Sequence, residues 1–226
     1  MLWSVRSGCS SARTARGCAR EPVTSSRTML AHHRYGLYLL YQGRLAEAQP
    51  VLERAVALDP LYASVNMNLG RLHVCARRPD QAIPLLRTAV ELSPGLGLAH
   101  EQLGHAYIQQ GKSSAALAAF RRAAALSGPR GSAQLAYALA VTGQRAEAEV
   151  LLRELIDPSS GPFIPPVAVA MAYVGLSDAD AASQWLDRAY AEHAAFMDGI
   201  KATQAFDSLH ADPRWAHLLR RMGLEP

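Results

Sequence analysis

The sequence has few of the residues that build disulfide-linked, membrane-spanning or β-rich proteins. Its three cysteines, Cys9, Cys18 and Cys75, are too few and too scattered for a disulfide framework or a zinc site. The uncharged run over 161–177 is interrupted by prolines and is shorter than the roughly 20 residues that a membrane span needs. Aromatic residues make up only 7% of the chain, whereas a β-sandwich would draw on aromatic and β-branched residues. These shortages predict an all-α protein without a membrane segment, in a reducing, cytoplasmic setting.

The net charge of +4 is concentrated at the amino-terminal end. Residues 1–28 hold five arginines against one glutamate, and the rest of the chain carries equal numbers of basic and acidic side chains. A basic isoelectric point commonly indicates nucleic acid or an anionic membrane as a partner. Because the excess lies in this tail alone, we expect no nucleic-acid binding by residues 29–226.

From residue 29 onward, the sequence repeats itself every 34 residues. Four columns keep their residue type over three copies: Gly36, Gly70 and Gly104; Ala48, Ala82 and Ala116; Leu52, Leu86 and Phe120; Ala55, Ala89 and Ala123. Pro60 and Pro94 share the same spacing. A period in this range is typical of helix pairs that stack into a solenoid.

The columns also make physical sense as a helix–turn–helix unit. Small residues at the eighth and twentieth positions allow the two helices of one unit to approach closely, and a large residue at the twenty-fourth fills the space beside them. Gly43 and Gly111 lie between the helices, where the end of a helix favours glycine. Pro60 and Pro94 end the second helix, because proline cannot continue the hydrogen-bond ladder.

These residue types at this period resemble the tetratricopeptide repeat. The resemblance implies a right-handed α-solenoid of five units at about 29–62, 63–96, 97–128, 129–162 and 163–194, with the first helix of the fourth unit shortened by about two residues. Residues 195–226 are expected to form capping helices, because a solenoid ends with an apolar face that needs cover. Trp215, Leu218, Leu219 and Met222 form the apolar stripe of the last of these helices.

The amino-terminal tail does not fit the repeat. Residues 1–28 are rich in Arg, Ser and Gly, and we expect them to be disordered and dispensable for folding. An organellar transit peptide shares this composition. A third interpretation is that residues 1–28 are translated from a wrongly assigned start codon.

The carboxy-terminal part resembles a narrower group. The sequences Trp185-Leu186-Asp187-Arg188-Ala189-Tyr190 and Asp212-Pro213-Arg214-Trp215 resemble the ending of tetratricopeptide regions that close bacterial signalling and transcription-regulatory proteins. This resemblance implies an alternative function, a detached regulatory or sensory domain of a transcription regulator or a Ser/Thr kinase.

The resemblance to the repeat also implies a partner and a surface. Tetratricopeptide solenoids bind ligands on the concave face, which is lined by the first helix of each unit. We therefore expect a protein or peptide partner in contact with His33, Leu37, Tyr41, Met67, Arg71, Glu101, His105, Gln109 and Tyr137. The alternative for each position is packing against the neighbouring helix. A chaperone-peptide clamp is not expected, because His33 and Leu37 replace its Lys and Asn.

Motifs that could carry catalysis fail on spacing. His100 and His105 are five residues apart, whereas the zinc-protease motif places its histidines four apart on one helical face. Ser159 and Ser160 have no preceding strand, no nucleophile-elbow spacing and no nearby acid or base. The sequence predicts a non-catalytic interaction scaffold without a metal or cofactor.

Overall fold

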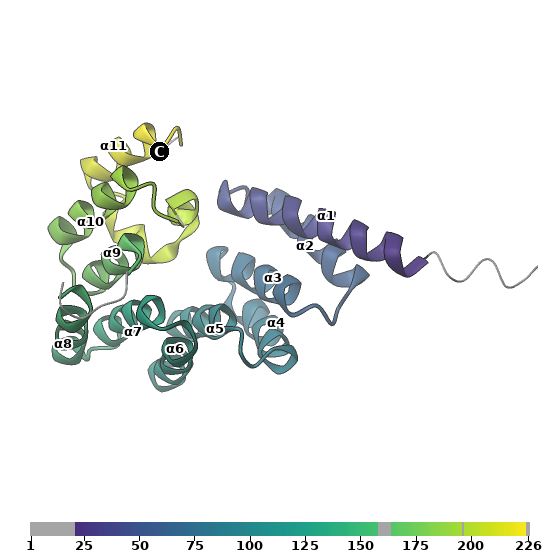
Figure 1. The fold of residues 1–226 in the computed structure, drawn as a ribbon, viewed down its shortest axis with the longest axis horizontal. Coiled ribbons are helices and arrows are strands. Elements are labelled where there is room, and N and C mark those ends of the chain that lie inside the picture. Colours follow the sequence, from purple (N-terminus) through teal and green to yellow (C-terminus); the bar gives the residue numbers. More distant parts are fainter. Residues whose placement is uncertain (1–20, 158–163, 196, 225–226) are drawn as a thin grey trace, which may run out of the picture.

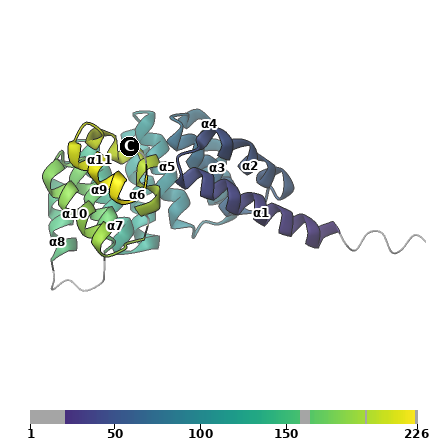
Figure 2. The same ribbon diagram turned by 90° about the horizontal axis from the view of Figure 1, so that it is seen from above.

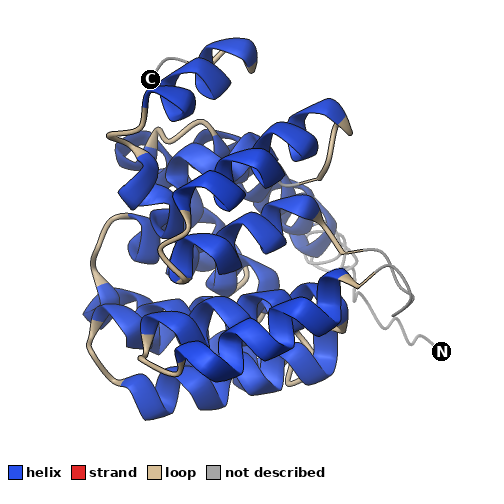
Figure 3. Cartoon of the chain, turned by 90° about the vertical axis from the view of Figure 1, so that its left-hand side faces the viewer, coloured by secondary structure: helices blue, strands red, loops and turns tan. Residues whose placement is uncertain are grey.

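The structure is a computed structural model, which describes residues 21–157, 164–195 and 197–224. In this part of the chain every regular element is a helix and no strand occurs (Figure 3). The helices follow one another around a curve that brings the carboxy-terminal elements back towards α1 (Figure 1). The expected all-α solenoid is confirmed.

Ten of the helices form five antiparallel pairs, one for each expected unit. The pairs are α1 (Glu21–Tyr41) with α2 (Leu45–Leu58), α3 (Ala63–Cys75) with α4 (Pro79–Leu92), α5 (Gly97–Gln109) with α6 (Ser113–Ser127), α7 (Pro129–Val141) with α8 (Arg145–Ile156), and α9 (Pro166–Gly175) with α10 (Ala179–Ala191). The 3₁₀ helices η1 (Met197–Ala202) and η2 (Gln204–Leu209) and the short helix α11 (Pro213–Arg221) follow.

The turn inside each pair uses one residue in the left-handed region of the backbone. Gly43, Gly111 and Gly143 have φ values of 73°, 69° and 90°. Arg77 and Ser177 occupy the same place in the second and fifth pairs with φ near 60°, a conformation that costs a residue with a Cβ about 1–2 kcal/mol. The turn geometry is therefore retained even where the sequence lacks the glycine that favours it.

In the first three pairs, the two helices meet at the glycine of the eighth position. A Cβ added to Gly70 would lie 2.6 Å from Leu86 Cγ, and one added to Gly104 would lie 2.5 Å from Phe120 Cε2. Leu86 and Phe120 are fully buried. The large residue of the twenty-fourth position thus fills the space that the glycine leaves open, as the repeat pattern indicates.

The fourth pair corrects one expectation. Helix α7 has 13 residues, as many as α5, so the first helix of this unit is not shortened. This unit follows the third at less than the 34-residue period because the connection before it is short: Gly128 alone joins α6 to α7. Its φ of 58° and ψ of −141° lie in a region open essentially to glycine only.

The first helix also begins earlier than the repeat. Helix α1 starts at Glu21 and extends past the rest of the solenoid (Figure 2), so residues 21–28 are helical and not without structure as expected. Met29 is the first buried side chain of this helix, and the described side chains before it are exposed. Residues 1–20 of the tail, like Ser159 and Ser160, lie outside the described residues.

The segment after α10 has two roles, where a single cap was expected. The apolar stripe of α11 packs into one cluster with Leu186 of α10, as a cap should. Residues 197–209, which we call the strap, instead run along the concave side, where η1 contacts α1 and η2 contacts α9. The apolar residues of the strap belong to the carboxy-terminal part of the core, where Met197, Ile200, Ala205, Phe206 and Leu209 are buried.

Replacing Gly70 by leucine tests the contact inside a pair. The larger side chain must displace Leu86, and overpacking of this kind costs roughly 1–3 kcal/mol. We expect a lower free energy of unfolding in urea denaturation. Gly95→Leu is the control, because a Cβ at Gly95 meets nothing within 4 Å. Equal stabilities of the two variants would contradict this packing.

Replacing Phe206 by alanine tests the strap. Phe206 is fully buried and its ring centroid lies 5.7 Å from that of Trp215. Truncating a buried aromatic side chain costs about 3–5 kcal/mol, so the variant should unfold at clearly lower denaturant concentration. Leu61→Ala is the control, because Leu61 is exposed. A change as small as in the control would mean that the strap does not belong to the core.

Candidate binding site on the concave face

The concave face carries an arginine at its centre. Arg71 of α3 is partly buried, its Nη1 lies 3.4 Å from the hydroxyl of Tyr41 in α1, and its guanidinium carbon lies 4.9 Å from the centroid of that ring. A cation over an aromatic face is attracted by the ring quadrupole. Among the described residues, no carboxylate forms an ion pair with Arg71. Tyr41 therefore fixes the position of this guanidinium group.

A buried ion pair lies on the next two units. Arg130 Nη2 of α7 is 3.2 Å from Oε1 and 2.9 Å from Oε2 of Glu101 in α5. The side chain of Glu101 is 6% exposed and that of Arg130 is 22% exposed. Burial raises the pKa of Glu101, against the opposing effect of the positive charges of Arg130 and Arg71. Both guanidinium groups therefore act on the same carboxyl group.

His105 completes this polar centre as a neutral side chain. Its ring packs edge-on against Phe120, at 5.0 Å between centroids, and 5.6 Å from Tyr137. Burial, together with the positive charges of Arg71 and Arg130, lowers the pKa of His105 to about 4. At neutral pH this imidazole adds polarity to the site but no charge.

The strap forms the remaining side of the site. Gln109 Nε2 of α5 donates a hydrogen bond to the carbonyl of Val74, at 2.8 Å, and another to Oε1 of Gln204. Arg77 forms an ion pair with Asp207. A Cβ added to Gly199 would lie 3.2 Å from Tyr41 and 3.3 Å from Arg71 Nη2, so the absence of a side chain lets the strap pass closely over these two residues.

Between the strap and the first helices lies a space that we call the central cavity. It contains about 810 Å³ not filled by atoms, part of it open to solvent. Its polar lining comprises Arg71, Glu101, Gln102, His105, Arg130, Gln134, Thr203 and Gln204. Helices α3, α5, α7 and α9 and the strap all contribute to the wall, so no single unit forms this space.

The structure places the nine expected site residues in three different settings. Arg71, Glu101 and His105 line the central cavity. Tyr41 and Gln109 contact the strap. The others pack between helices: Met67 and Tyr137 are buried, Leu37 joins the core of the first two units, and His33 bonds through Nε2 to Asn68 Nδ2 at 2.7 Å.

Sequence reasoning missed the residues that the strap brings to this face. Thr203, Gln204 and Phe206 belong to no repeat, and nothing in their spacing indicates a 3₁₀ segment folded back onto the solenoid. Gln134 was missed for another reason. It occupies the sixth position of its unit, outside the positions expected to line the groove, and Gln102 at the same position of the third unit lines the cavity as well.

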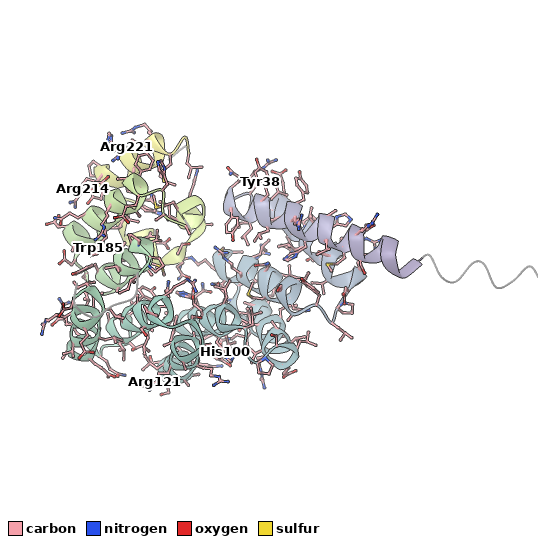
Figure 4. All side chains as sticks on the ribbon, viewed as in Figure 1. Tyr38, His100, Arg121, Trp185, Arg214 and Arg221 are labelled. Atoms are coloured by element: carbon pink, nitrogen blue, oxygen red, sulfur yellow. The ribbon has the colours of Figure 1, made fainter. Side chains whose placement is uncertain are left out.

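The concave face combines polar and apolar groups. It offers guanidinium, carboxyl, amide and imidazole groups beside apolar walls. Over the described ranges, no group of three or more His, Cys, Asp or Glu side chains could hold a metal ion. His100, which is labelled in Figure 4, bonds through Nε2 to the carbonyl of Pro94, at 3.1 Å.

Comparison with known families identifies the repeat. A model described as "Tetratricopeptide repeat" matches residues 35–96 and 101–161, which is more than half of the chain. The chain belongs to the tetratricopeptide-repeat family. Members of this family generally serve as scaffolds for protein interactions, and no catalytic family was identified. A search of the curated proteins found no match.

Solved structures show the same fold at low sequence identity. A thermophilic TPR protein of Thermus thermophilus is 22% identical, with a TM-score of 0.58 over 72% of this chain and 90% of that one. The crystal structure of MamA protein has a TM-score of 0.50 and 20% identity, over 74% and 93% of the two chains. A Thermobaculum terrenum O-GlcNAc transferase has a TM-score of 0.54 and 21% identity, over 58% of this chain but 26% of that enzyme. These likenesses show the fold alone.

The helices were also compared with the length of a membrane span. None in the described part of this tetratricopeptide-repeat protein is long and apolar enough to cross a membrane.

Acid pH should destabilise the protein through His105. Because its folded-state pKa is lowered to about 4, the unfolded chain takes up a proton first as the pH falls below 6.5. The free energy of unfolding should decrease between pH 6.5 and pH 4, by up to about 3 kcal/mol from this group.

A urea denaturation series across this pH range, compared with His105→Gln, measures the contribution. His217→Gln in α11 is the control, because His217 is exposed and does not line the cavity. The His105 variant should lose less stability towards pH 4 than the wild type and the control. If the free energy of unfolding decreases equally with pH in all three proteins, His105 does not cause the loss of stability.

Proposed function

We propose that this protein is a non-catalytic scaffold that binds a peptide or a segment of a partner protein on its concave face. The observation that supports this proposal is the arginine at the centre of that face. Arg71 is held by Tyr41, no carboxylate of the described residues forms an ion pair with it, and it lines a cavity that has both polar and apolar walls. A peptide with an acidic residue next to an apolar one would complement both features.

The strap divides the face that such a partner can use. It contacts Tyr41, Arg71 and Gln109, and of these three only Arg71 also lines the central cavity. Arg71, Glu101 and His105 border the cavity and remain within reach. Met67 and Tyr137 contribute by supporting the first helices from within the core. We infer that a partner first contacts α3, α5 and α7, beside the strap.

Helix α11 gives no separate support to the alternative function, a detached regulatory or sensory domain. Arg214 pairs with Asp180 and Asp212, and Arg221 pairs with Asp187 and lies over the ring of Tyr190 (Figure 4). These contacts join α11 to α10 within the chain. We therefore propose the scaffold function alone.

Charge reversal at Arg71 tests the proposed surface. Peptides selected from a display library for binding to the wild type would be measured against Arg71→Glu by calorimetry. We expect at least a tenfold loss of affinity, which corresponds to about 1.4 kcal/mol. Arg121→Glu is the control, because Arg121 is exposed on the outer face (Figure 4).

Melting temperatures must accompany these titrations, because the new glutamate lies near Glu101. An Arg71 variant that melts like the wild type and binds the selected peptides unchanged would refute the concave site. If the selected peptides instead lose affinity for the Arg121→Glu variant, the partner binds on the second helices of the units.

A further inference from the structure

The strap is attached to the two ends of the solenoid by different kinds of contact. Ile200, Phe206 and Leu209 are buried in one apolar cluster with residues of α7, α9, α10 and α11. None of the described residues of α1 to α4 belongs to this cluster. Burial of apolar surface therefore anchors the strap to the carboxy-terminal part of the curve.

Towards the first three units, the strap makes polar contacts. Asp207 forms an ion pair with Arg77, in the turn after α3, and the two side chains are 40% and 53% exposed. Gln204 accepts a hydrogen bond from Gln109 of α5. An exposed ion pair adds little to stability, because water solvates both charges when they separate. These contacts can therefore break at small cost.

Gly199 brings the strap against α1 and α3 without a side chain of its own. A Cβ at this position would lie 3.2 Å from Tyr41 Cδ1 and 3.3 Å from Arg71 Nη2. The contact leaves no room for a larger residue, and it contributes little apolar area because glycine has no side chain to bury. We call the contacts that Gly199, Gln204 and Asp207 make with the first three units the latch.

Space that no atom fills remains beside the latch. Gln204 borders the central cavity and also a second space of about 490 Å³, part of it open to solvent. Gly43 and Leu45 of the first unit and Asp207 of the strap border this second space as well. A well-formed protein core is instead packed as densely as an organic crystal. The latch is therefore a loosely packed joint, unlike the apolar side of the strap.

A solenoid can open at such a joint. Each unit is held by its neighbours, so small changes of angle between successive units add up along the stack. Figure 1 shows the end of α1 facing the strap across the open side of the curve, and η1 contacts α1 there. Opening releases Tyr41, Arg71, Arg77 and Gln109 from the strap. These four side chains include two positive charges and no carboxylate.

We propose that the latch closes the concave face, and that its release lets an acidic segment of a partner protein bind to Tyr41, Arg71, Arg77 and Gln109. Asp207 shows which charge this surface accepts, because its carboxylate pairs with Arg77 in the closed form. An Asp or Glu of the partner takes that place. The binding step rests on the proposed scaffold function, whereas the latch does not.

Distances between two spin labels test the latch without any partner. The labels are attached to Tyr38→Cys in α1 and Arg220→Cys in α11, both exposed positions, after the native cysteines are replaced by alanine. Pulsed electron resonance should give one main distance for the closed form. Gly199→Leu, which forces a side chain between the strap and Tyr41, should add a longer distance. Asp207→Ala should do the same by removing the ion pair.

Glu47→Ala is the control, because it removes an exposed ion pair with Arg44 that lies within the first unit. Its distances should equal those of the unmodified latch. If Gly199→Leu and Asp207→Ala also leave the distances unchanged, the latch proposal is wrong. Circular dichroism establishes that each variant is folded, and Asp207→Ala, a change at a half-exposed side chain, decides the question alone if Gly199→Leu does not fold.

The two halves of the ion pair test the binding step. The peptide of highest affinity from the display library is titrated by calorimetry against Asp207→Ala and Arg77→Ala. Both variants break the same contact, so both should show the longer distance. Asp207→Ala should bind the peptide more tightly, by the factor by which the open fraction rises. Arg77→Ala should bind it no more tightly than the wild type, because the group that holds the acidic residue is gone.

The outcomes separate the latch from the scaffold function. Equal peptide affinities of Asp207→Ala and Arg77→Ala would show that the partner does not use Arg77, and would overturn the binding step. A library that yields no peptide overturns the scaffold function and the binding step together, while the spin-label distances still decide on the latch. Unchanged distances overturn the latch even if peptides bind to the concave face.

Discussion

Close contact between the two helices of each unit is the constraint on which the rest of the structure depends. A glycine at the eighth position leaves less than 3 Å for a Cβ, and one large side chain from the second helix occupies that place. This contact recurs in Gly36–Leu52, Gly70–Leu86 and Gly104–Phe120, so successive pairs share one geometry. Stacking similar pairs with a small rotation produces the curve, and the curve produces the concave face.

The periodic part of the protein could be predicted from its sequence, because each column reports a contact that recurs. Gly70 and its counterparts meet the same kind of neighbour in each of three units, so three copies reveal one rule. The strap has no such signal. Ile200 and Phe206 are fully buried, yet they belong to no repeated column, and the cluster they join combines residues of α7, α9, α10 and α11. Contacts of this kind are visible only in three dimensions.

The candidate site shows the same limit. The resemblance to the repeat placed Arg71, Glu101 and His105 on the inner surface, and the structure brings them to one cavity. Spacing does not distinguish a side chain that faces the cavity from one that packs against the next helix, and Met67 and Tyr137 pack. The depressed pKa of His105 likewise arises from burial between units, together with two arginines of neighbouring units.

The strap also has a consequence for how the chain folds. Contacts within and between adjacent units join residues a few tens of positions apart, and proteins dominated by such local contacts fold fast. Gln109 to Gln204 joins residues 95 positions apart, and Gly199 reaches back to Tyr41 in the first unit. Bringing such distant segments together costs more loop-closure entropy than forming a contact within one unit. During synthesis the strap also leaves the ribosome after all five units. Its contacts with the first units therefore form after the local contacts within and between the units.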